Sequence, residues 1–497
     1  MAEKLLGHYI GGKILVDHKA RRLGVFDPGT GVVSAEVTLG DETVVNDAVR
    51  AASEAFASWG KASISQRTRV LFAFRELLEK NVTEVARRIS SQHGKTLPDA
   101  MGEVRRGMEV VEFSCGIAQV QKSQYSQGVS RDVDTFSIRQ PLGVVAGITP
   151  FNFPAMVPMW MFPVAIATGN TFILKPSEKD PSASLLLAEL FHAAGLPDGV
   201  FNVVQGDKRV VDAILDHKGI SAVSFVGSTP IASYIYARAA ANGKRVQALG
   251  GAKNHMVVLP DADLDAAADA VVSAAYGSAG ERCMAISVLV AVGDVADSLV
   301  AKIVDRVGDL RVGYGLEEGA DMGPLVTAAH RDKVAGYVER ALAQGAKVVL
   351  DGRAHPAAKN PGFFLGPSLI DDVDPSMDVY KDEIFGPVLS VCRVPDSDAA
   401  IEIVNANPYA NGASIFTRSG AAAHRFQSEL AAGMIGINVS IPVPVAYYSF
   451  GGNKSSLFGD THVHGEEGVK FYTRAKVVTQ RWANERIPGV DFGFPQT

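Results

Sequence analysis

The feature that most constrains the fold is an alternation of continuous apolar segments with amphipathic ones, beginning at Val144. Strand-like segments lie at 144–147, 171–174, 201–204, 222–226 and 245–249, and helical segments at 182–194, 209–215 and 230–241. Strands that are apolar on both faces and separated by helices are typical of a parallel sheet covered on both sides. This half of the chain therefore predicts a doubly wound α/β domain.

A second alternation after Gly251 predicts another α/β domain. Its helices are expected at 264–278, 295–307, 331–344 and 421–430, and its strands at 286–292, 348–350, 388–391 and 412–416. Residues 125–138 alternate differently, which predicts an antiparallel ribbon with one wet face, expected to be covered by another subunit. The acidic region from Glu42 to Arg88 is interpreted as solvated helix faces.

Composition excludes several classes of protein. The 497 residues are 47% hydrophobic, which is enough for two or three packed domains. The net charge is -6, and the acidic and basic residues are interspersed, so nucleic acid is not an expected partner. Cys115, Cys283 and Cys392 are odd in number and far apart, which favours a reducing compartment. Residues 1–10 resemble no signal or transit peptide, and the uncharged stretch 144–168 holds four prolines. We expect a cytoplasmic enzyme that does not enter a membrane.

A glycine turn at 225–230 predicts an anion site. Gly227 and Ser228 follow a strand and precede Pro230 at a helix start, where free N–H groups favour a group such as pyrophosphate. Many α/β proteins have such a turn without a ligand, and no Gly-x-Gly-x-x-Gly fingerprint occurs in the chain.

Lys175 and Glu178 follow another strand end, in the run 173–178. Such a pair can hold the two hydroxyls of an adenine ribose, and Glu178 would repel a 2′-phosphate. The alternative is an ordinary surface salt bridge.

Cys283 is the candidate nucleophile. It follows Gly277, Gly280 and Arg282 on a bend where the backbone can approach a ligand, and the neighbouring cation is expected to favour the thiolate. The apolar neighbours of Cys115 and Cys392 indicate packing instead.

Asn152 lies in a loop rich in proline and aromatic residues. Its amide either caps a turn or donates to a developing oxyanion. The histidine pair at 462–464 lacks further ligands at suitable spacing, so no metal site is expected.

Six motifs in order carry a resemblance over almost the whole chain. These are 151–154, 175–178, 225–229, 249–251, 280–283 and 383–387. Together they resemble the aldehyde dehydrogenase superfamily. The resemblance implies a Rossmann-like NAD-binding domain (1–117 and 141–248), an α/β catalytic domain (249–453) and a β-ribbon oligomerisation region (118–140 and 454–497).

The resemblance also implies roles for single residues. Cys283 would be the nucleophile, and Asn152 with the backbone N–H of Cys283 would form the oxyanion hole. The implied cofactor residues are Phe151, Lys175, Ser177 and Glu178, with Gly227 and Ser228 at the pyrophosphate and Glu383 and Phe385 at the nicotinamide riboside.

One position departs from most of the superfamily. Hydrolytic members carry glutamate before the Leu-Gly-Gly run, whereas this chain has Ala248. A cysteine thioester without a positioned base favours a thiol acceptor, and coenzyme A is the leading candidate.

The runs 250–255, 283–285, 441–444 and 449–456 resemble a CoA-acylating branch of the superfamily. Members of that branch oxidise malonate or methylmalonate semialdehyde with NAD, lose carbon dioxide, and release acetyl-CoA or propionyl-CoA. A carboxylate substrate needs a cationic clamp, and Arg282 with Arg105 or Arg106 could supply it. The branch resemblance implies an arginine at position 106, so Arg106 and Arg282 are the candidates. Surface solvation is the alternative for Arg106.

Two rival functions remain open, a hydrolytic semialdehyde dehydrogenase and a catalytically silent relative. A homo-oligomer is expected, arranged as a dimer of dimers. The sequence does not decide between a dimer and a tetramer, nor between malonate and methylmalonate semialdehyde as the preferred substrate.

Overall fold

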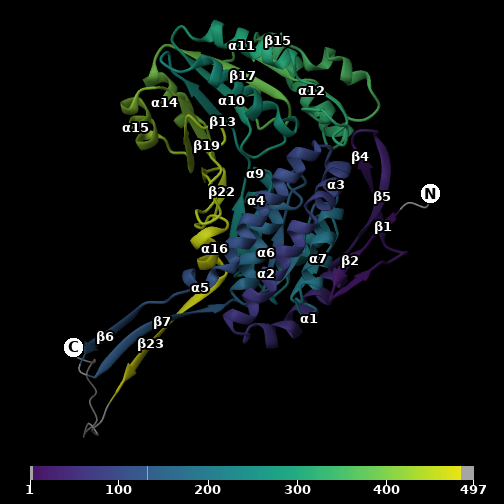
Figure 1. The fold of residues 1–497 in the computed structure, drawn as a ribbon, viewed down its shortest axis with the longest axis vertical. Coiled ribbons are helices and arrows are strands. Elements are labelled where there is room, and N and C mark those ends of the chain that lie inside the picture. The colour runs from purple at the N-terminus through teal and green to yellow at the C-terminus, as the bar shows by residue number, and fades with distance from the viewer. Residues whose placement is uncertain (1–3, 131, 483–497) are drawn as a thin grey trace.

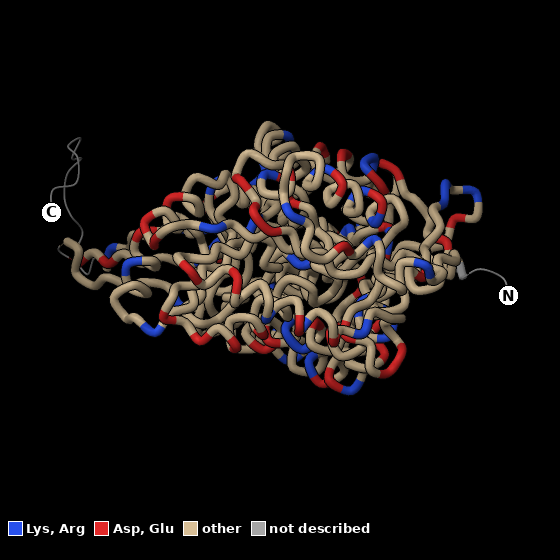
Figure 2. Tube along the Cα trace, turned by 90° about the horizontal axis from the view of Figure 1, so that it is seen from above, with Lys and Arg blue, Asp and Glu red and all other residues tan. Residues whose placement is uncertain are grey.

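The computed structural model describes residues 4–130 and 132–482. Two large sheets with flanking helices form the body, and a ribbon projects from it at the lower left of Figure 1. The predicted α/β class is confirmed. Basic and acidic residues are interspersed along the trace (Figure 2).

The first large sheet has eight strands in the order β22-β12-β11-β8-β9-β10-β2-β3. The five strands from β8 to β12 run parallel, as predicted, and the strands from the two ends of the chain add antiparallel edges. The bounds are β2 His8–Ile10, β3 Lys13–Leu15, β8 Val144–Ile148, β9 Thr171–Lys175, β10 Phe201–Val203, β11 Ile220–Val226, β12 Arg245–Leu249 and β22 Leu457–Phe458.

Every residue of β8 and β9 is buried, because helices cover both faces of this sheet. One face packs against α1 (Glu42–Trp59), α8 (Lys208–Asp216) and α9 (Thr229–Ala241). The other packs against α6 (Met156–Ala167) and α7 (Ser182–Ala193). The doubly wound arrangement predicted from the alternating pattern is therefore present.

A further layer of helices packs on α6 and α7. It comprises α2 Ile64–Lys80, α3 Val82–His93, α4 Leu97–Cys115 and α5 Ile117–Val120. The sequence interpretation described only solvated faces up to Arg88. The structure adds an inner face, since Leu71, Phe74 and Leu78 of α2 are fully buried.

The second large sheet has the order β15-β16-β17-β14-β13-β19-β20. Its strands are β13 Asn254–Val258, β14 Ile286–Val292, β15 Lys347–Leu350, β16 Ser368–Asp371, β17 Val388–Val394, β19 Gly412–Phe416 and β20 Met434–Ile437. Its helices are α10 Leu264–Tyr276, α11 Ala296–Gly308, α12 Ala328–Ala343, α13 Asp378–Lys381, α14 Ser397–Ala406 and α15 Gly420–Glu429. Of these, β13, β16, β20, α13 and α14 were not anticipated from the sequence.

Three strands form the projecting ribbon in the order β23-β7-β6. They are β6 Tyr125–Ser130, β7 Val133–Pro141 and β23 Thr473–Arg481, all antiparallel. The predicted ribbon exists, with β23 as an additional strand from the end of the chain. The predicted domain boundaries stay a prediction, and residues 483–497 of the oligomerisation region lie outside the described residues.

Smaller elements complete the fold. A three-stranded sheet contains β1 Lys4–Leu6, β4 Arg21–Asp27 and β5 Val32–Leu39, a short pair contains β18 Tyr409–Ala410 and β21 Asn453–Lys454, and α16 spans Gly465–Phe471.

Candidate active site

A cavity of about 350 Å³ opens where the parallel strands β8, β9 and β11 end. The carboxyl ends of parallel strands are the usual ligand edge of an open α/β sheet. Six residues predicted to bind the cofactor line this one cavity: Phe151, Lys175, Ser177, Glu178, Gly227 and Ser228. The structure thus brings together groups that are up to 77 residues apart in sequence (228 − 151).

Lys175 and Glu178 form an ion pair in this cavity, with 2.8 Å between Nζ and Oε2. The lysine side chain is only 7% exposed, unlike that of an ordinary surface pair. Burial alone would raise the pKa of Glu178, but Lys175 lowers it below its usual value. Glu178 is therefore an anion at neutral pH, able to accept hydroxyl hydrogen bonds.

The N-terminus of α9 faces the same cavity. Ser228 is the N-cap residue, but its side chain makes no capping hydrogen bond, and Pro230 lies in the first turn. The unsatisfied N–H groups of a helix start attract anions. This end of the cavity has the donor set that a pyrophosphate requires.

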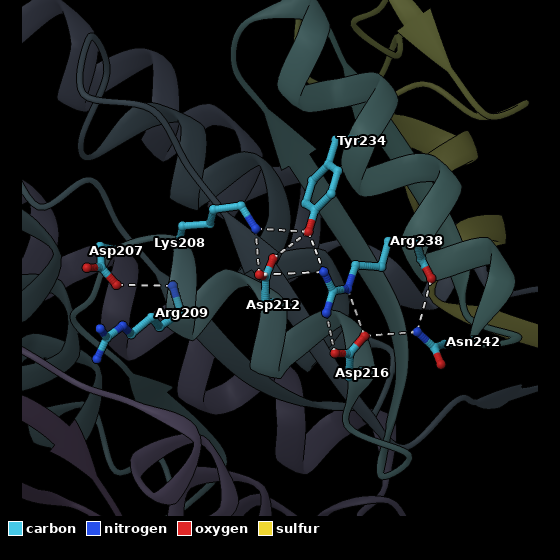
Figure 3. A network of polar contacts seen from close by, with 8 residues as sticks. All are labelled: Asp207, Lys208, Arg209, Asp212, Asp216, Tyr234, Arg238 and Asn242. Carbon is cyan, nitrogen blue, oxygen red and sulfur yellow. Dashed lines mark hydrogen bonds and ion pairs between the residues drawn. The ribbon is translucent and has the colours of Figure 1, made fainter.

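A polar network joins α8 to α9 beside the cavity (Figure 3). The hydroxyl of Tyr234 donates to Asp212 Oδ1 at 2.7 Å and accepts from Lys208 Nζ at 3.1 Å. Arg238 Nη2 lies 2.6 Å from Asp216 Oδ2. Lys208 and Tyr234 also line the cavity, so the network fixes one of its walls. Sequence reasoning missed these residues, because charges four apart on a helix are usual on solvated faces.

A second, narrower cavity contains Cys283 together with Arg282, Glu383 and Phe385. Glu383 Oε1 accepts a hydrogen bond from the N–H of Ala252 at 2.9 Å. Burial raises the pKa of Glu383 to about 7. A Cβ atom at Gly251 would lie 2.2 Å from Glu383 Oε2, so a larger residue there would displace the end of the Glu383 side chain.

The backbone before Cys283 is left-handed at three successive residues. Ser278, Ala279 and Gly280 have φ values of 54°, 52° and 73°. For residues other than glycine this conformation is costly and persists only where its surroundings impose it. A Cβ atom at Gly280 would lie 2.2 Å from the carbonyl oxygen of Gly386, which explains why glycine occupies this position.

Two amide side chains hold the carbonyl oxygen of Cys283. Asn254 Nδ2 donates to it at 2.9 Å and Asn411 Nδ2 at 3.2 Å. They come from the starts of two neighbouring strands, β13 and β19. Sequence reasoning singled out neither residue, although the run 250–255 contains Asn254. The available signal was an amide at or just before the start of a short strand.

Asn152 is 3% exposed, and its Nδ2 donates to the carbonyl oxygen of Glu281 at 3.0 Å. A buried ion pair supports its loop. Lys95 Nζ donates to Glu103 Oε2 at 2.8 Å and to the carbonyl oxygen of Asn152 at 2.6 Å. Glu103 Oε1 accepts from the N–H of Ala155 at 2.9 Å. The amide of Asn152 thus contacts the segment before the nucleophile, and its role in an oxyanion hole stays a prediction.

Burial and then the charge of Glu383 raise the pKa of Cys283 to about 12, which favours the neutral thiol. Arg282 opposes this shift, as the sequence led us to expect, but the effect of burial is larger. Arg282 Nη2 also lies 2.7 Å from Asp99 Oδ1.

The two predicted substrate arginines lie in different settings. Arg282 lines the cavity of Cys283. Arg106 pairs with Glu109 at 2.7 Å and donates to the carbonyl oxygen of Pro444 at 3.1 Å. It therefore holds the loop at 441–444, one of the segments that carried the branch resemblance.

Ala248 lies on β12, fully buried in the core shared with α8 and α9. It pairs with Phe225 on β11 and with Phe458 on β22. No carboxylate stands at this position to activate water.

Within 4–130 and 132–482, no group of three or more His, Cys, Asp or Glu side chains is placed to hold a metal ion. The helices of the described part of the chain include none long and apolar enough to cross a membrane.

Comparison with known proteins agrees with this geometry. Residues 15–478 match the model of the aldehyde dehydrogenase family. A malonate-semialdehyde dehydrogenase of Pseudomonas aeruginosa is 56% identical over 99% of both chains, and one of Geobacillus kaustophilus is 50% identical over 96% of this chain and 99% of its own.

Two solved structures share the fold at a TM-score of 0.96, each covering 97% of this chain and 99% of its own. One, described as a methylmalonate-semialdehyde dehydrogenase of Sinorhizobium meliloti complexed with NAD, is 51% identical. The other, a methylmalonate-semialdehyde dehydrogenase of Oceanimonas doudoroffii, is 52% identical. As its motifs predicted, the chain belongs to the aldehyde dehydrogenase family.

Proposed function

We propose that this protein oxidises malonate semialdehyde, methylmalonate semialdehyde or both with NAD, and transfers the acyl group to coenzyme A. The observation that carries the proposal is Cys283 in a cavity beside Glu383, in a chain whose Ala248 supplies no base for water. The names of its relatives support the substrate class.

The first half-reaction belongs to Cys283. Its sulfur attacks the aldehyde carbon, the thiol proton passes to solvent, and the carbonyl oxygen becomes an oxyanion that the Asn152 amide and the Cys283 N–H stabilise. Loss of hydride from the same carbon then leaves a thioester on Cys283.

NAD is the hydride acceptor that this scheme requires, and the residues present fit it. The Lys175–Glu178 pair suits the adenosine ribose, the α9 start suits the pyrophosphate, and Glu383 with Phe385 faces the cavity of the nucleophile. Because Glu178 is an anion, a 2′-phosphate at this position would be repelled.

The substrate's own carboxylate explains the loss of carbon dioxide. In the malonyl or methylmalonyl thioester, the carboxylate is attached to the carbon next to the thioester carbonyl. The C–C bond can break because that carbonyl accepts the electron pair, and a proton then completes the acetyl or propionyl thioester. Arg282, in the cavity of Cys283, is the cation that we assign to the carboxylate.

The second half-reaction distinguishes a thiol from water. Attack of the CoA sulfur on the thioester releases acyl-CoA and returns Cys283 to a thiol. Attack by water needs a positioned base, which contributes about a hundredfold to ten-thousandfold to the rate. A thiolate, in contrast, is intrinsically nucleophilic.

We also propose a cytoplasmic homo-oligomer, arranged as a dimer of dimers. Three free cysteines favour a reducing compartment. The ribbon exposes apolar side chains, with Tyr125 60% and Val477 67% exposed, and a partner subunit would cover them.

The test is NADH formation from malonate semialdehyde and NAD, with and without CoA, with identification of the product. We expect one turnover without CoA, steady turnover with it, and acetyl-CoA as the product. Rapid steady turnover to a free acid without CoA would establish the hydrolytic alternative, and no turnover at all would establish the silent one.

Position 248 offers a matched pair of variants. Ala248→Glu should raise hydrolysis relative to Ala248→Gln, because the two side chains have similar size and only the former can act as a base. The buried position predicts that both variants lose stability.

A further inference from the structure

A buried carboxylate that pairs with no lysine or arginine of the described residues lies close to the nucleophile in sequence. Glu281 is two residues before Cys283 and is fully buried. Its Oε1 lies 3.4 Å from the N–H nitrogen of Val326 and 3.5 Å from His330 Nε2. Its Oε2 faces His93 Nε2 at 3.6 Å, and neither atom of this second contact has a hydrogen-bond partner.

The hydrogen-bond pattern fixes which groups are donors. His93 Nδ1 accepts from the N–H of Lys95 at 3.2 Å, so neutral His93 carries its proton on Nε2, facing Glu281. His330 Nε2 lies 2.7 Å from the carbonyl oxygen of Phe385, so this nitrogen also carries a proton. All the groups around the carboxylate are therefore donors, which suits its ionised form.

The same histidines contact aromatic residues of the predicted nicotinamide site. His93 stacks on Phe151 with 5.9 Å between ring centroids, and Phe151 contacts Phe385 edge-on, also at 5.9 Å. Phe385 has a φ of 61°, so its left-handed turn needs external support. The Glu281 backbone carbonyl also accepts from Asn152. Glu281 therefore connects three segments of the active site, through its side chain to the two histidines and through its backbone carbonyl to Asn152.

We propose that Glu281 is a positioning residue whose carboxylate, through His93 and His330, holds the Phe151 and Phe385 turns against the Cys283 segment. The assignment rests on the dehydrogenase reaction proposed above. Glu281 acts through its neighbours and contacts neither cofactor nor substrate.

The charge of Glu281 depends on pH in the range where the enzyme is assayed. Burial raises its pKa to about 8, against the smaller opposing effects of Lys179 and Lys95. Burial lowers the pKa of His330 to about 4. Burial, helped by the charges of Lys95, Arg282 and Lys179, also lowers the pKa of His93 well below its usual value, so both rings stay neutral. As pH rises through about 8, the carboxylate forms, and its attraction to the Val326 N–H and to the two neighbouring histidine Nε2–H groups strengthens.

Glu281→Gln tests the proposal because it keeps the shape and removes the charge. The Gln amide presents N–H groups to donors, so it mimics the protonated form at every pH. We expect the rate of single-turnover NADH formation by the wild type to rise between pH 7 and pH 9, and the rate of the variant not to rise. At pH 9 the variant should be roughly tenfold to a hundredfold slower than the wild type. At pH 7 the two proteins should differ far less. Glu112→Gln, at an exposed position on α4, is the matched control.

Two further readouts separate this role from a loss of folding or from failure of the proposed reaction. Removing a buried charge should leave the melting temperature of Glu281→Gln at pH 9 unchanged or higher, so lost activity cannot reflect unfolding. Alkylation of Cys283 by iodoacetamide requires no substrate, and its pH profile should lose the inflection near pH 8 in the variant. Parallel profiles for both proteins, in alkylation or in turnover, would overturn the proposal.

Discussion

Replacing Lys95 by methionine tests whether the buried ion pair beneath the Asn152 loop supports both folding and catalysis. The ammonium is fully buried, with Glu103 Oε2 at 2.8 Å, the Asn152 carbonyl oxygen at 2.6 Å and the Phe153 ring centroid at 4.2 Å. Methionine has similar length and fills the space. It removes the hydrogen bonds and leaves the Glu103 carboxylate without its cation.

Breaking a buried pair by removing one partner costs about 3–5 kcal/mol. Glu103 keeps two backbone donors, Ala155 and Met156, which places the expected loss near the lower end of that range. Burial already raises the pKa of Glu103, and without Lys95 it rises further. A carboxyl group with a raised pKa binds its proton more tightly in the folded state, so the deficit of the variant should be small near pH 5 and grow toward pH 8.

Urea unfolding at both pH values measures this effect, with apparent free energies compared only between variants. The exposed Lys80→Met is the control and should stay within about 0.5 kcal/mol of wild type. The double variant Lys95→Met with Glu103→Gln removes the unpaired charge while keeping an acceptor for α6, and should regain part of the loss at pH 8. The single-turnover rate should fall roughly tenfold to a hundredfold, because the Asn152 amide moves. A deficit below about 1 kcal/mol at pH 8, or a double variant no more stable than the single one, would refute the reasoning.

Three more predictions follow from the site. Cys283→Ala should abolish NADH formation, and retention of even a tenth of wild-type turnover would exclude a covalent role. Replacing Arg106 or Arg282 by leucine should lower kcat/KM for malonate semialdehyde at least about tenfold more than for propanal. Equal losses for the two substrates would indicate a structural role. Asp99→Asn is the control for breaking the ion pair of Arg282. The wild type should prefer NAD to NADP, and Glu178→Gln should reduce this preference. A kcat/KM with NADP that equals or exceeds the value with NAD in the wild type would contradict the assignment of Glu178 to the adenosine ribose.

Periodicity anticipated most of the first sheet, because buried parallel strands such as β8 and β9 are continuous apolar runs. It missed strands such as β13, where Asn254 and His255 interrupt the pattern. Their polar groups are satisfied by contacts distant in sequence, such as the Cys283 carbonyl and the Tyr380 hydroxyl. The early helices show the same limit, since composition indicated their wet faces but not the surface they pack against.

For the site, motifs identified residues that stand next to glycine and proline turns. They did not reveal Lys95, Glu103 or His93, because polar residues of these types are usually solvated and only tertiary packing buries these three. The sequence shows the cation of Arg282 beside Cys283, and Arg282 does lower the pKa of the thiol. It does not show the burial that outweighs this effect, because burial follows only from tertiary packing.

The edges of the eight-stranded sheet have a consequence for biosynthesis. One edge strand, β3, ends at Leu15, and the opposite one, β22, begins at Leu457. A ribosome has therefore made more than nine-tenths of the polypeptide before β12, which carries Ala248, gains its last neighbour. Until then a strand with free backbone N–H and C=O groups stays open to pairing with other nascent chains. Chaperone binding during synthesis should therefore persist until residues 457–458 have left the exit tunnel, and a chain truncated before them should remain bound.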